Sequence, residues 1–216
     1  MAEHLPNQYP ARLQVDYPEH LGQLSTLLRI PFSIPIWILA SLLPVAPAIF
    51  LSLVAEGAID GDAATGIFGA AFFLPLVLML LFRRKYPRWW FEFLLELTRL
   101  QLRIAAYFEL LTDQYPSTDE EQSVLLELDY PDAEELNQFL PIVKWLLLIS
   151  HCIALAVLGI IAVFVLIVAW FAILFTSRYP RGLFNYIVGV NRWYLRVSAY
   201  GFLLITDRYP PFRLGP

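Results

Sequence analysis

Hydrophobic residues are grouped along the chain in long stretches that contain no charge. Three such stretches cover positions 30–55, 63–82 and 145–177. A helix that crosses about 30 Å of hydrocarbon needs roughly 20 apolar residues, so the first two stretches predict one membrane span each. The polar segment 56–62 lies between them and contains two glycines. The sequence therefore predicts a transmembrane hairpin over about 30–82.

The third stretch allows two interpretations. One helix over 145–177 would be about 50 Å long, whereas two helices of about 16 residues would each be short for a full crossing. Lys144 precedes the stretch and arginines follow it from Arg178 onward, and basic flanks are typical of the cytoplasmic side. Because an even number of crossings keeps both ends on that side, we predict a second hairpin over about 141–176. Gly159 is the glycine available for its turn.

Two other patterns occur outside the charge-free stretches. Alternating runs at 12–16 and 124–129 predict short strands, which could pair with each other or with a partner. Polar positions spaced three or four residues apart predict amphipathic helices over about 88–111 and 181–205. The polar face of the first helix carries Glu92, Glu96, Arg99 and Arg103, and that of the second carries Asn185, Gly189, Arg192 and Arg196. Apolar helices with aromatic ends and an arginine stripe suit the membrane–water interface.

The chain also contains an internal repeat. Lys85-Tyr86-Pro87-Arg88 is matched later in the chain by Arg178-Tyr179-Pro180-Arg181, and Asp16-Tyr17-Pro18 is matched by Asp129-Tyr130-Pro131. Such self-similarity predicts two tandem units, residues 1–116 and 117–216. We expect an all-α integral membrane protein in which each unit has a short strand, a transmembrane hairpin and an interfacial amphipathic helix.

Composition agrees with a membrane protein and excludes other classes. Apolar residues make up 58% of the 216 residues and charged residues 16%, which is more apolar than a soluble chain of this length can cover with polar surface. The net charge of −4 argues against nucleic acid as a partner. No metal-binding spacing, phosphate loop or nucleophile motif occurs, so we predict no cofactor and no enzymatic activity.

Four arginines on the predicted interfacial helices are candidates for binding. They either anchor the helices by extending to the interface or contact phosphate headgroups or a partner's carboxylates. Their positions match between the units: Arg99, Arg103, Arg192 and Arg196. Anionic phospholipid is the expected ligand, and the second pair is expected to bind it more tightly because Glu92 and Glu96 lie beside the first pair.

Two further features concern acidic residues. Asp113 and Asp207 both lie in a Thr-Asp-x-Tyr-Pro motif, where an aspartate is expected to close a turn. The segment 113–135 holds nine of the 19 acidic residues and no basic one. It is either a solvated linker or a docking surface for a basic cytoplasmic protein.

The second unit resembles a known family in its residues 171–184 (FAILFTSRYPRGLF) and in Thr206-Asp207-Arg208-Tyr209-Pro210-Pro211-Phe212. These look like a bacterial membrane family catalogued only as a domain of unknown function, and the first unit is the more divergent match. The resemblance implies a bacterial inner-membrane protein and assigns no activity or catalytic residue.

These patterns together favour a non-catalytic accessory or scaffold protein of the bacterial inner membrane, which organises a membrane complex or anionic lipid. It would be multi-pass, with both termini in the cytoplasm. The alternative is a transporter or channel subunit that forms a pore by oligomerising, since the prolines of the first span (Pro31, Pro35, Pro44 and Pro47) could break a helix at a substrate path.

Overall fold

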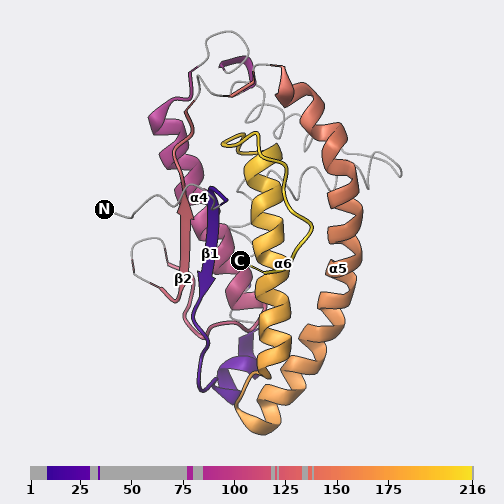
Figure 1. The fold of residues 1–216 in the computed structure, drawn as a ribbon. Helices are drawn as coiled ribbons and strands as arrows, with labels where there is room; N and C mark the ends of the chain where they lie inside the picture. The colour runs from indigo at the N-terminus through magenta and orange to yellow at the C-terminus, as the bar shows by residue number, and fades with distance from the viewer. Residues whose placement is uncertain are drawn as a thin grey trace.

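In the part of the chain that the computed structural model describes, three long helices pack with one pair of strands (Figure 1). The structure describes residues 9–29, 34, 77–79, 85–117, 120, 122–132, 136–137 and 139–215. The elements are β1 (Ala11–Val15), α4 (Arg88–Phe108), β2 (Val124–Leu128), α5 (Leu140–Thr176) and α6 (Arg181–Gly201). A short helical segment also covers residues 23–29. The predicted first hairpin, about 30–82, lies almost entirely outside the described residues.

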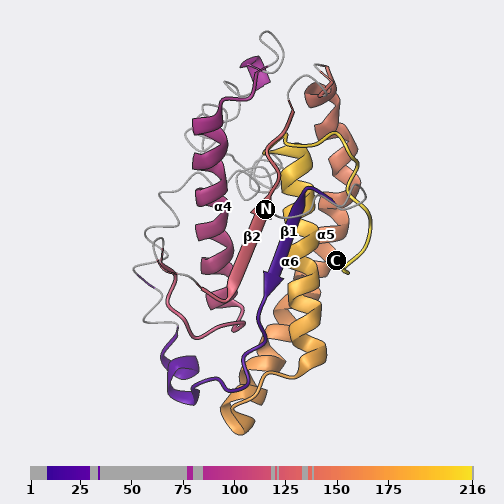
Figure 2. The same cartoon turned by 60° about the vertical axis from the view of Figure 1, so that its left-hand side comes forward.

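The two strands pair with each other. β1 and β2 run antiparallel, with Leu13 opposite Leu126 at the centre of the register. Their inward side chains are buried, as the alternation predicts, whereas Gln14 and Leu125 point away from the core. Each strand packs against a helix from the other half of the chain, β1 against α6 and β2 against α4. The two halves are therefore interlocked (Figure 2).

The predicted amphipathic helices are present as α4 and α6, and each begins directly after a Tyr-Pro pair. Both end a few residues before the predicted limits. Leu110, just after α4, has φ 63°, and Leu204, just after α6, has φ 53°. A leucine in this left-handed region cannot continue a right-handed helix. Both leucines are buried, so packing maintains the unfavourable backbone conformation.

The second predicted hairpin, about 141–176, is wrong: α5 is one continuous helix of 37 residues. Gly159 forms no turn, since no described glycine has a positive φ and its surroundings leave a Cβ free of contacts. A single glycine weakens a helix by about 1 kcal/mol, which is not enough to break a long apolar helix that packs against α6. The helix ends instead at Ser177, whose φ of 54° gives a left-handed cap.

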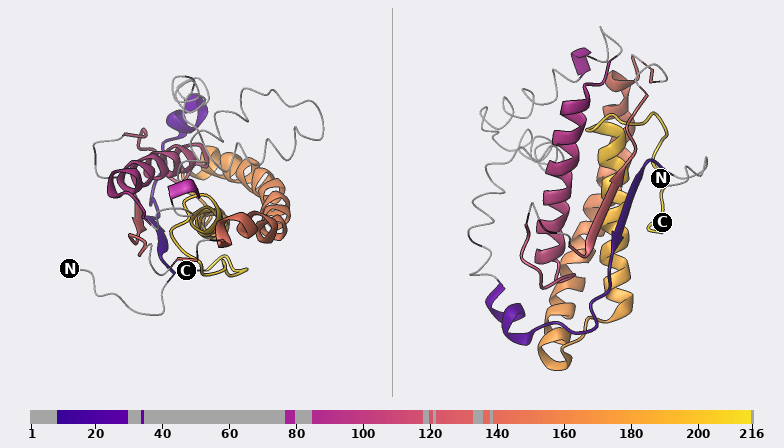
Figure 3. Two further views of the ribbon diagram at one scale, coloured as in Figure 1. Left: turned by 90° about the horizontal axis from the view of Figure 1, so that it is seen from above. Right: turned by 90° about the vertical axis from the view of Figure 1, so that its left-hand side faces the viewer.

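α6 lies between the strands and α5, which curves around it (Figure 3). Near the start of α5, Leu148 packs against Trp193, Val197 and Tyr200 of α6. Close to its end, Ala169 and Ile173 are fully buried in the main core. By length and composition, α5 is the one helix among the described residues that could cross a membrane. The described fold is thus mostly helical, with a single long apolar helix and a small two-stranded sheet.

The contact between α5 and α6 leads to a paired prediction on two glycines. A Cβ at Gly201 would lie 1.9 Å from Cδ1 of Leu148, whereas one at Gly159 would meet nothing within 4 Å. Gly201→Ala should lower the free energy of unfolding by about 1–3 kcal/mol through overpacking. Gly159→Ala should raise it by about 1 kcal/mol through helix propensity. Thermal unfolding in mild detergent measures both; equal shifts of the same sign would contradict the close packing of α5 on α6.

Candidate functional site

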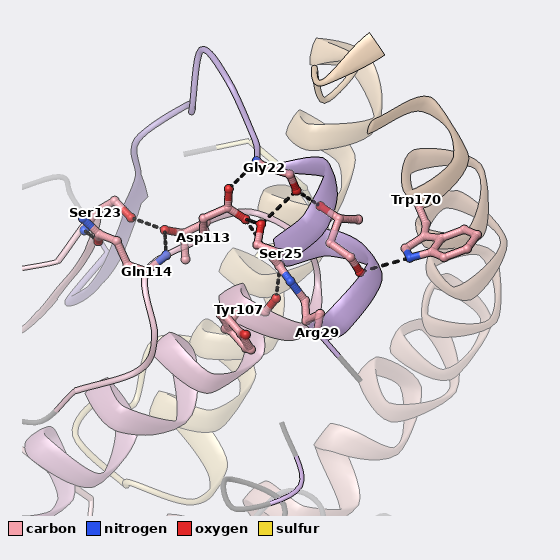
Figure 4. A network of polar contacts seen from close by, with 10 residues as sticks. Gly22, Ser25, Arg29, Tyr107, Asp113, Gln114, Ser123 and Trp170 are labelled. Atoms are coloured by element: carbon pink, nitrogen blue, oxygen red, sulfur yellow. Dashed lines mark hydrogen bonds and ion pairs between the residues drawn. The ribbon is translucent and has the colours of Figure 1, made fainter. Parts of the chain in front are cut away.

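A buried arginine joins the start of the first charge-free stretch to the loop after α4 (Figure 4). The side chain of Arg29 is only 4% exposed, and one of its terminal nitrogens lies 2.5 Å from Oδ1 of Asp113. Its other terminal nitrogen donates to the backbone carbonyl of Tyr107, and the guanidinium lies 4.5 Å from the centre of the Tyr107 ring. We call Arg29, Tyr107 and Asp113 the first clamp.

Asp113 also holds the short helical segment 23–29 at its beginning. Its Oδ2 accepts a hydrogen bond from the backbone N–H of Gly22 at 2.7 Å, and its Oδ1 accepts one from the hydroxyl of Ser25 at 3.1 Å. A carboxylate at a helix N-terminus satisfies amide groups that have no partner in the helix. Trp170 of α5 donates to the carbonyl of Thr26 at 3.4 Å, which places this end of α5 beside the first clamp.

A lysine makes the equivalent set of contacts near the start of α5. The side chain of Lys144 is 1% exposed, and its Nζ lies 2.7 Å from Oδ1 of Asp207 and donates to the carbonyl of Thr206 at 2.7 Å. The Nζ also lies 4.7 Å from the centre of the Tyr200 ring. Oδ2 of Asp207 accepts from the backbone N–H of Asn137 at 2.6 Å. We call Lys144, Tyr200 and Asp207 the second clamp.

The turn-closing role predicted for the two aspartates takes a different form in the structure. The local turns are held by the preceding threonines: the Thr112 hydroxyl accepts from the N–H of Gln114, and the Thr206 hydroxyl from that of Arg208, each at 3.1 Å. The aspartates reach instead to segments far away in the chain, at Gly22 and Asn137. Sequence spacing could not reveal this, because the cations that pair with the two carboxylates, Arg29 and Lys144, are also far from them in the chain.

Tyrosines of the Tyr-Pro pairs form a second set of matched contacts across the interlocked halves. The Tyr130 hydroxyl donates to the carbonyl of Tyr86 at 2.5 Å, and the Tyr17 hydroxyl donates to the carbonyl of Tyr179. The Tyr130 ring lies 5.2 Å from the ring of Phe91, and the Tyr17 ring lies 5.0 Å from that of Phe184. Each partner phenylalanine is in the first turn of the helix that follows.

The four candidate arginines are engaged by the protein itself. Arg103 is buried and donates to the carbonyl of Ser117 at 2.5 Å. Arg196 is also buried and donates to the carbonyls of Arg213 and Gly215, at 2.6 and 3.0 Å. Arg192 donates to the carbonyl of Leu13 in β1 at 2.9 Å. Arg99 forms an ion pair with Glu96, as charge spacing on a helix favours.

Other basic residues are exposed where α4 and α6 begin, and sequence reasoning did not select them. They occupy matched positions in and beside the two Tyr-Pro-Arg motifs: Lys85, Arg88, Arg178 and Arg181. The guanidinium of Arg88 lies 5.5 Å from the centre of the Tyr130 ring, and that of Arg181 lies 5.1 Å from the Tyr17 ring. The recurrence of Tyr-Pro-Arg was the signal that could have identified them.

The acidic segment 113–135 is partly occupied by internal pairing. Asp113 belongs to the first clamp, and Arg12 of β1 lies 3.0 Å from carboxylate oxygens of both Glu127 and Asp129. These three carboxylates are therefore paired with cations of the described fold. Glu127 nevertheless remains 65% exposed at its side chain, on the side of the sheet away from α6.

One buried and one half-buried polar side chain, His151 and Glu109, lie apart from the clamps. His151 of α5 is fully buried, stacks on Phe212 at 4.0 Å between ring centres and accepts a hydrogen bond from the Trp193 indole at 3.0 Å. Glu109, at the end of α4, accepts a hydrogen bond from the side-chain amide of Asn191. Burial raises the pKa of Glu109 from 4.5 to about 7, partly offset by this hydrogen bond. Among the described residues, no group of three or more His, Cys, Asp and Glu is placed to hold a metal ion.

Fold and contacts together define a mostly helical protein in which Arg29 and Lys144 join helical segments to the loops after α4 and α6. A family model, described as a domain of unknown function (DUF4389), matches residues 141–213. This is about a third of the chain, and it includes nearly all of α5, the whole of α6 and every residue of the second clamp. Comparison with curated proteins and with solved structures yields no match.

The second clamp gives a prediction about a buried charge. Asp207→Ala should destabilise the protein by about 3–5 kcal/mol, because it leaves Lys144 buried without its carboxylate. Lys144→Met/Asp207→Ala, which removes both charges, should recover a substantial part of that loss. Chemical unfolding in detergent, followed by tryptophan fluorescence, tests this. A double variant less stable than Asp207→Ala would show that the ion pair is not what holds this region.

Glu109 gives a prediction about pH. Because its pKa is raised in the folded state, the folded protein binds this proton more tightly than the unfolded chain does, and stability should fall as pH rises from about 4.5 to about 7. Glu109→Gln should weaken this decline and raise the melting temperature at pH 8. The control Glu96→Gln, in an exposed ion pair, should keep the wild-type decline. Identical pH profiles for wild type and Glu109→Gln would contradict the burial of this carboxyl group.

Proposed function

We propose that this protein is a non-catalytic accessory or scaffold protein of the bacterial inner membrane, which organises a membrane complex or its anionic lipid. The observation that carries the proposal is the outward face of α5, which is apolar from Ile153 to Phe175 and almost unburied in its most apolar stretch. Exposed apolar surface of this extent marks a membrane or protein interface. The two aspartates that recur in the chain are engaged in structural clamps, which supports a scaffold role.

The proposal includes a tandem duplication of residues 1–116 and 117–216. The matched contacts support it, since Tyr107 and Tyr200, Asp113 and Asp207, and Tyr86 and Tyr179 occupy equivalent places in the repeat register and make equivalent bonds. In this interpretation each clamp ties the first residues of a unit's membrane segment to the loop after its amphipathic helix. The clamps then fix where both membrane segments leave the polar layer.

Lipid contact is assigned to the exposed cations. Arg178 and Arg181 directly follow the apolar face of α5, and Phe175 next to them is 81% exposed. Cations beside an apolar surface are placed as headgroup-binding side chains require. The buried Arg103 and Arg196 support the fold in this proposal, and the exposed part of the acidic segment, including Glu127, remains a surface for a basic protein partner.

The proposal further includes a multi-pass topology with both termini in the cytoplasm. The acidic turn 56–62 and the basic residues on either side of the predicted first hairpin support it through the positive-inside rule. The hairpin itself lies almost entirely outside the described residues.

The test determines whether the protein is embedded in the membrane, how many copies associate and which lipid stays bound to them. After alkaline washing confirms membrane attachment, native mass spectrometry from nanodiscs that contain phosphatidylglycerol and phosphatidylcholine should give one or two copies with retained phosphatidylglycerol. Each basic residue near an anionic surface contributes about 1 kcal/mol, so Arg178→Gln/Arg181→Gln should weaken anionic lipid binding roughly thirtyfold. Arg12→Gln, which removes a cation from the sheet, should leave it unchanged.

Two results would contradict the proposal. A closed ring of many copies would favour the pore-forming alternative. Full release of the protein by alkaline washing would contradict the assignment to the membrane itself.

A further inference from the structure

α6 covers one side of α5 along most of its length. The α5 residues that face the core recur every three or four positions: Leu148, His151, Leu155, Leu158, Ala162, Val165, Ala169 and Ile173. Contacts occur near both ends and in the middle, where the Tyr186 hydroxyl donates to the carbonyl of Leu158 at 3.0 Å. Such a seam keeps the same side of α5 toward α6 over most of the helix.

The opposite side of α5 is exposed and uniformly apolar. Its residues also recur every three or four positions and are each at least half exposed: Ile153, Val157, Ile160, Phe164, Val168, Phe171 and Phe175. No charged residue occurs between Lys144 and Arg178. Exposing an apolar face of this length to water is unfavourable, whereas the hydrocarbon of a membrane matches its chemistry.

The position of the sheet limits how α5 can meet a bilayer. The strands, α6 and α5 extend along a common long axis (Figure 1). Arg192, at the middle of α6, donates to the carbonyl of Leu13 in β1, which lies next to the Arg12–Glu127 ion pair. If α5 crossed the bilayer, this exposed ion pair and the edges of a two-stranded sheet would lie at hydrocarbon depth, where charges and open sheet edges are strongly disfavoured.

Interfacial helices ordinarily carry their own polar face. α5 does not, but the two strands lie on the other side of α6 from α5 (Figure 3). They carry the polar side chains of Arg12, Gln14 and Glu127, so α6 and the sheet supply a polar layer on the covered side of α5. The assembly of α5, α6 and sheet is therefore amphipathic as a whole, apolar on the outer side of α5 and charged on the sheet.

We propose that α5 lies in the plane of the membrane, with its outer face among the acyl chains and the sheet toward the cytoplasm. The proposal rests on the membrane attachment stated under Proposed function. It accounts for the basic residues at the two ends of the helix, Lys144 at one end and Arg178 with Arg181 at the other. In this orientation both ends lie on the cytoplasmic side, as the positive-inside rule requires, although the helix contains no turn. It also removes the mismatch between a 37-residue helix, about 55 Å long, and about 30 Å of hydrocarbon.

Sidedness is the first measurement. Phe139→Cys and Gly182→Cys, both at exposed positions that bracket α5, are introduced into full-length protein with Cys152→Ser, so that each variant has a single cysteine. In sealed inverted membrane vesicles, a membrane-impermeant maleimide should label both positions without permeabilisation. Labelling of one position only after permeabilisation would mean that α5 crosses the bilayer, and the proposal would be overturned.

Depth is the second measurement, made with nitroxides on Leu146→Cys, Ile160→Cys and Phe175→Cys in phosphatidylglycerol–phosphatidylcholine vesicles. All three should be accessible to oxygen and lie at similar depth, roughly 5–10 Å below the headgroups. A crossing helix would place Ile160→Cys near 15 Å, half of the hydrocarbon thickness of about 30 Å, and the other two near the interface. The control Gln14→Cys, on the sheet, should be accessible to a water-soluble nickel reagent.

The remaining outcomes separate the in-plane orientation from the membrane assignment. Protection of Ile160→Cys from both oxygen and nickel would mean that protein, such as a second copy, covers the face, and would overturn the in-plane proposal while the membrane assignment stands. Failure of the full-length protein to float with vesicles would instead overturn the membrane assignment on which the orientation rests.

Discussion

The antiparallel pairing of β1 with β2 is the constraint on which the rest of the structure depends. Each strand belongs to one half of the chain and packs on the helix of the other half, so neither half can bury its helix face without the other strand. Two short strands alone are only marginally stable in water. The pair persists because α4 and α6 cover one of its faces. Arg12 adds partly exposed ion pairs to Glu127 in β2 and to Asp129 just after it, which contribute little by themselves.

A buried cation also ties distant segments together within each half of the chain. A charge removed from water is tolerated only when its partners replace the lost hydration. Arg29 and Lys144 each find a carboxylate, a backbone carbonyl and an aromatic ring, and in both cases those partners lie at or just after the end of an amphipathic helix. The cation therefore holds its segment to that helix end in one defined arrangement, which an apolar residue of similar size would not specify.

Sequence patterns predicted the elements better than their connections. Alternation located both strands, and period-3.6 spacing located α4 and α6 to within a few residues, because burial on one side determines both patterns. Two features could not be predicted from the sequence. The left-handed Leu110 and Leu204 carry no glycine or asparagine signal. The continuity of α5 was obscured because basic flanks favoured an even number of crossings, and because many of its residues are β-branched or aromatic and have only modest helix propensity.

The candidate site shows why repetition alone cannot separate structural from ligand-binding residues. Arg103 and Arg196 recur in register, which favoured a shared ligand, yet both donate to carbonyls of the chain that follows their own helix. Residues that recur in the sequence can make internal bonds as readily as they can form a binding site, so burial must distinguish the two roles. Arg88 and Arg181 also recur but remain exposed, each above a tyrosine ring that positions it without using its hydrogen-bond donors. Their planar, solvated donors are what phosphate recognition requires.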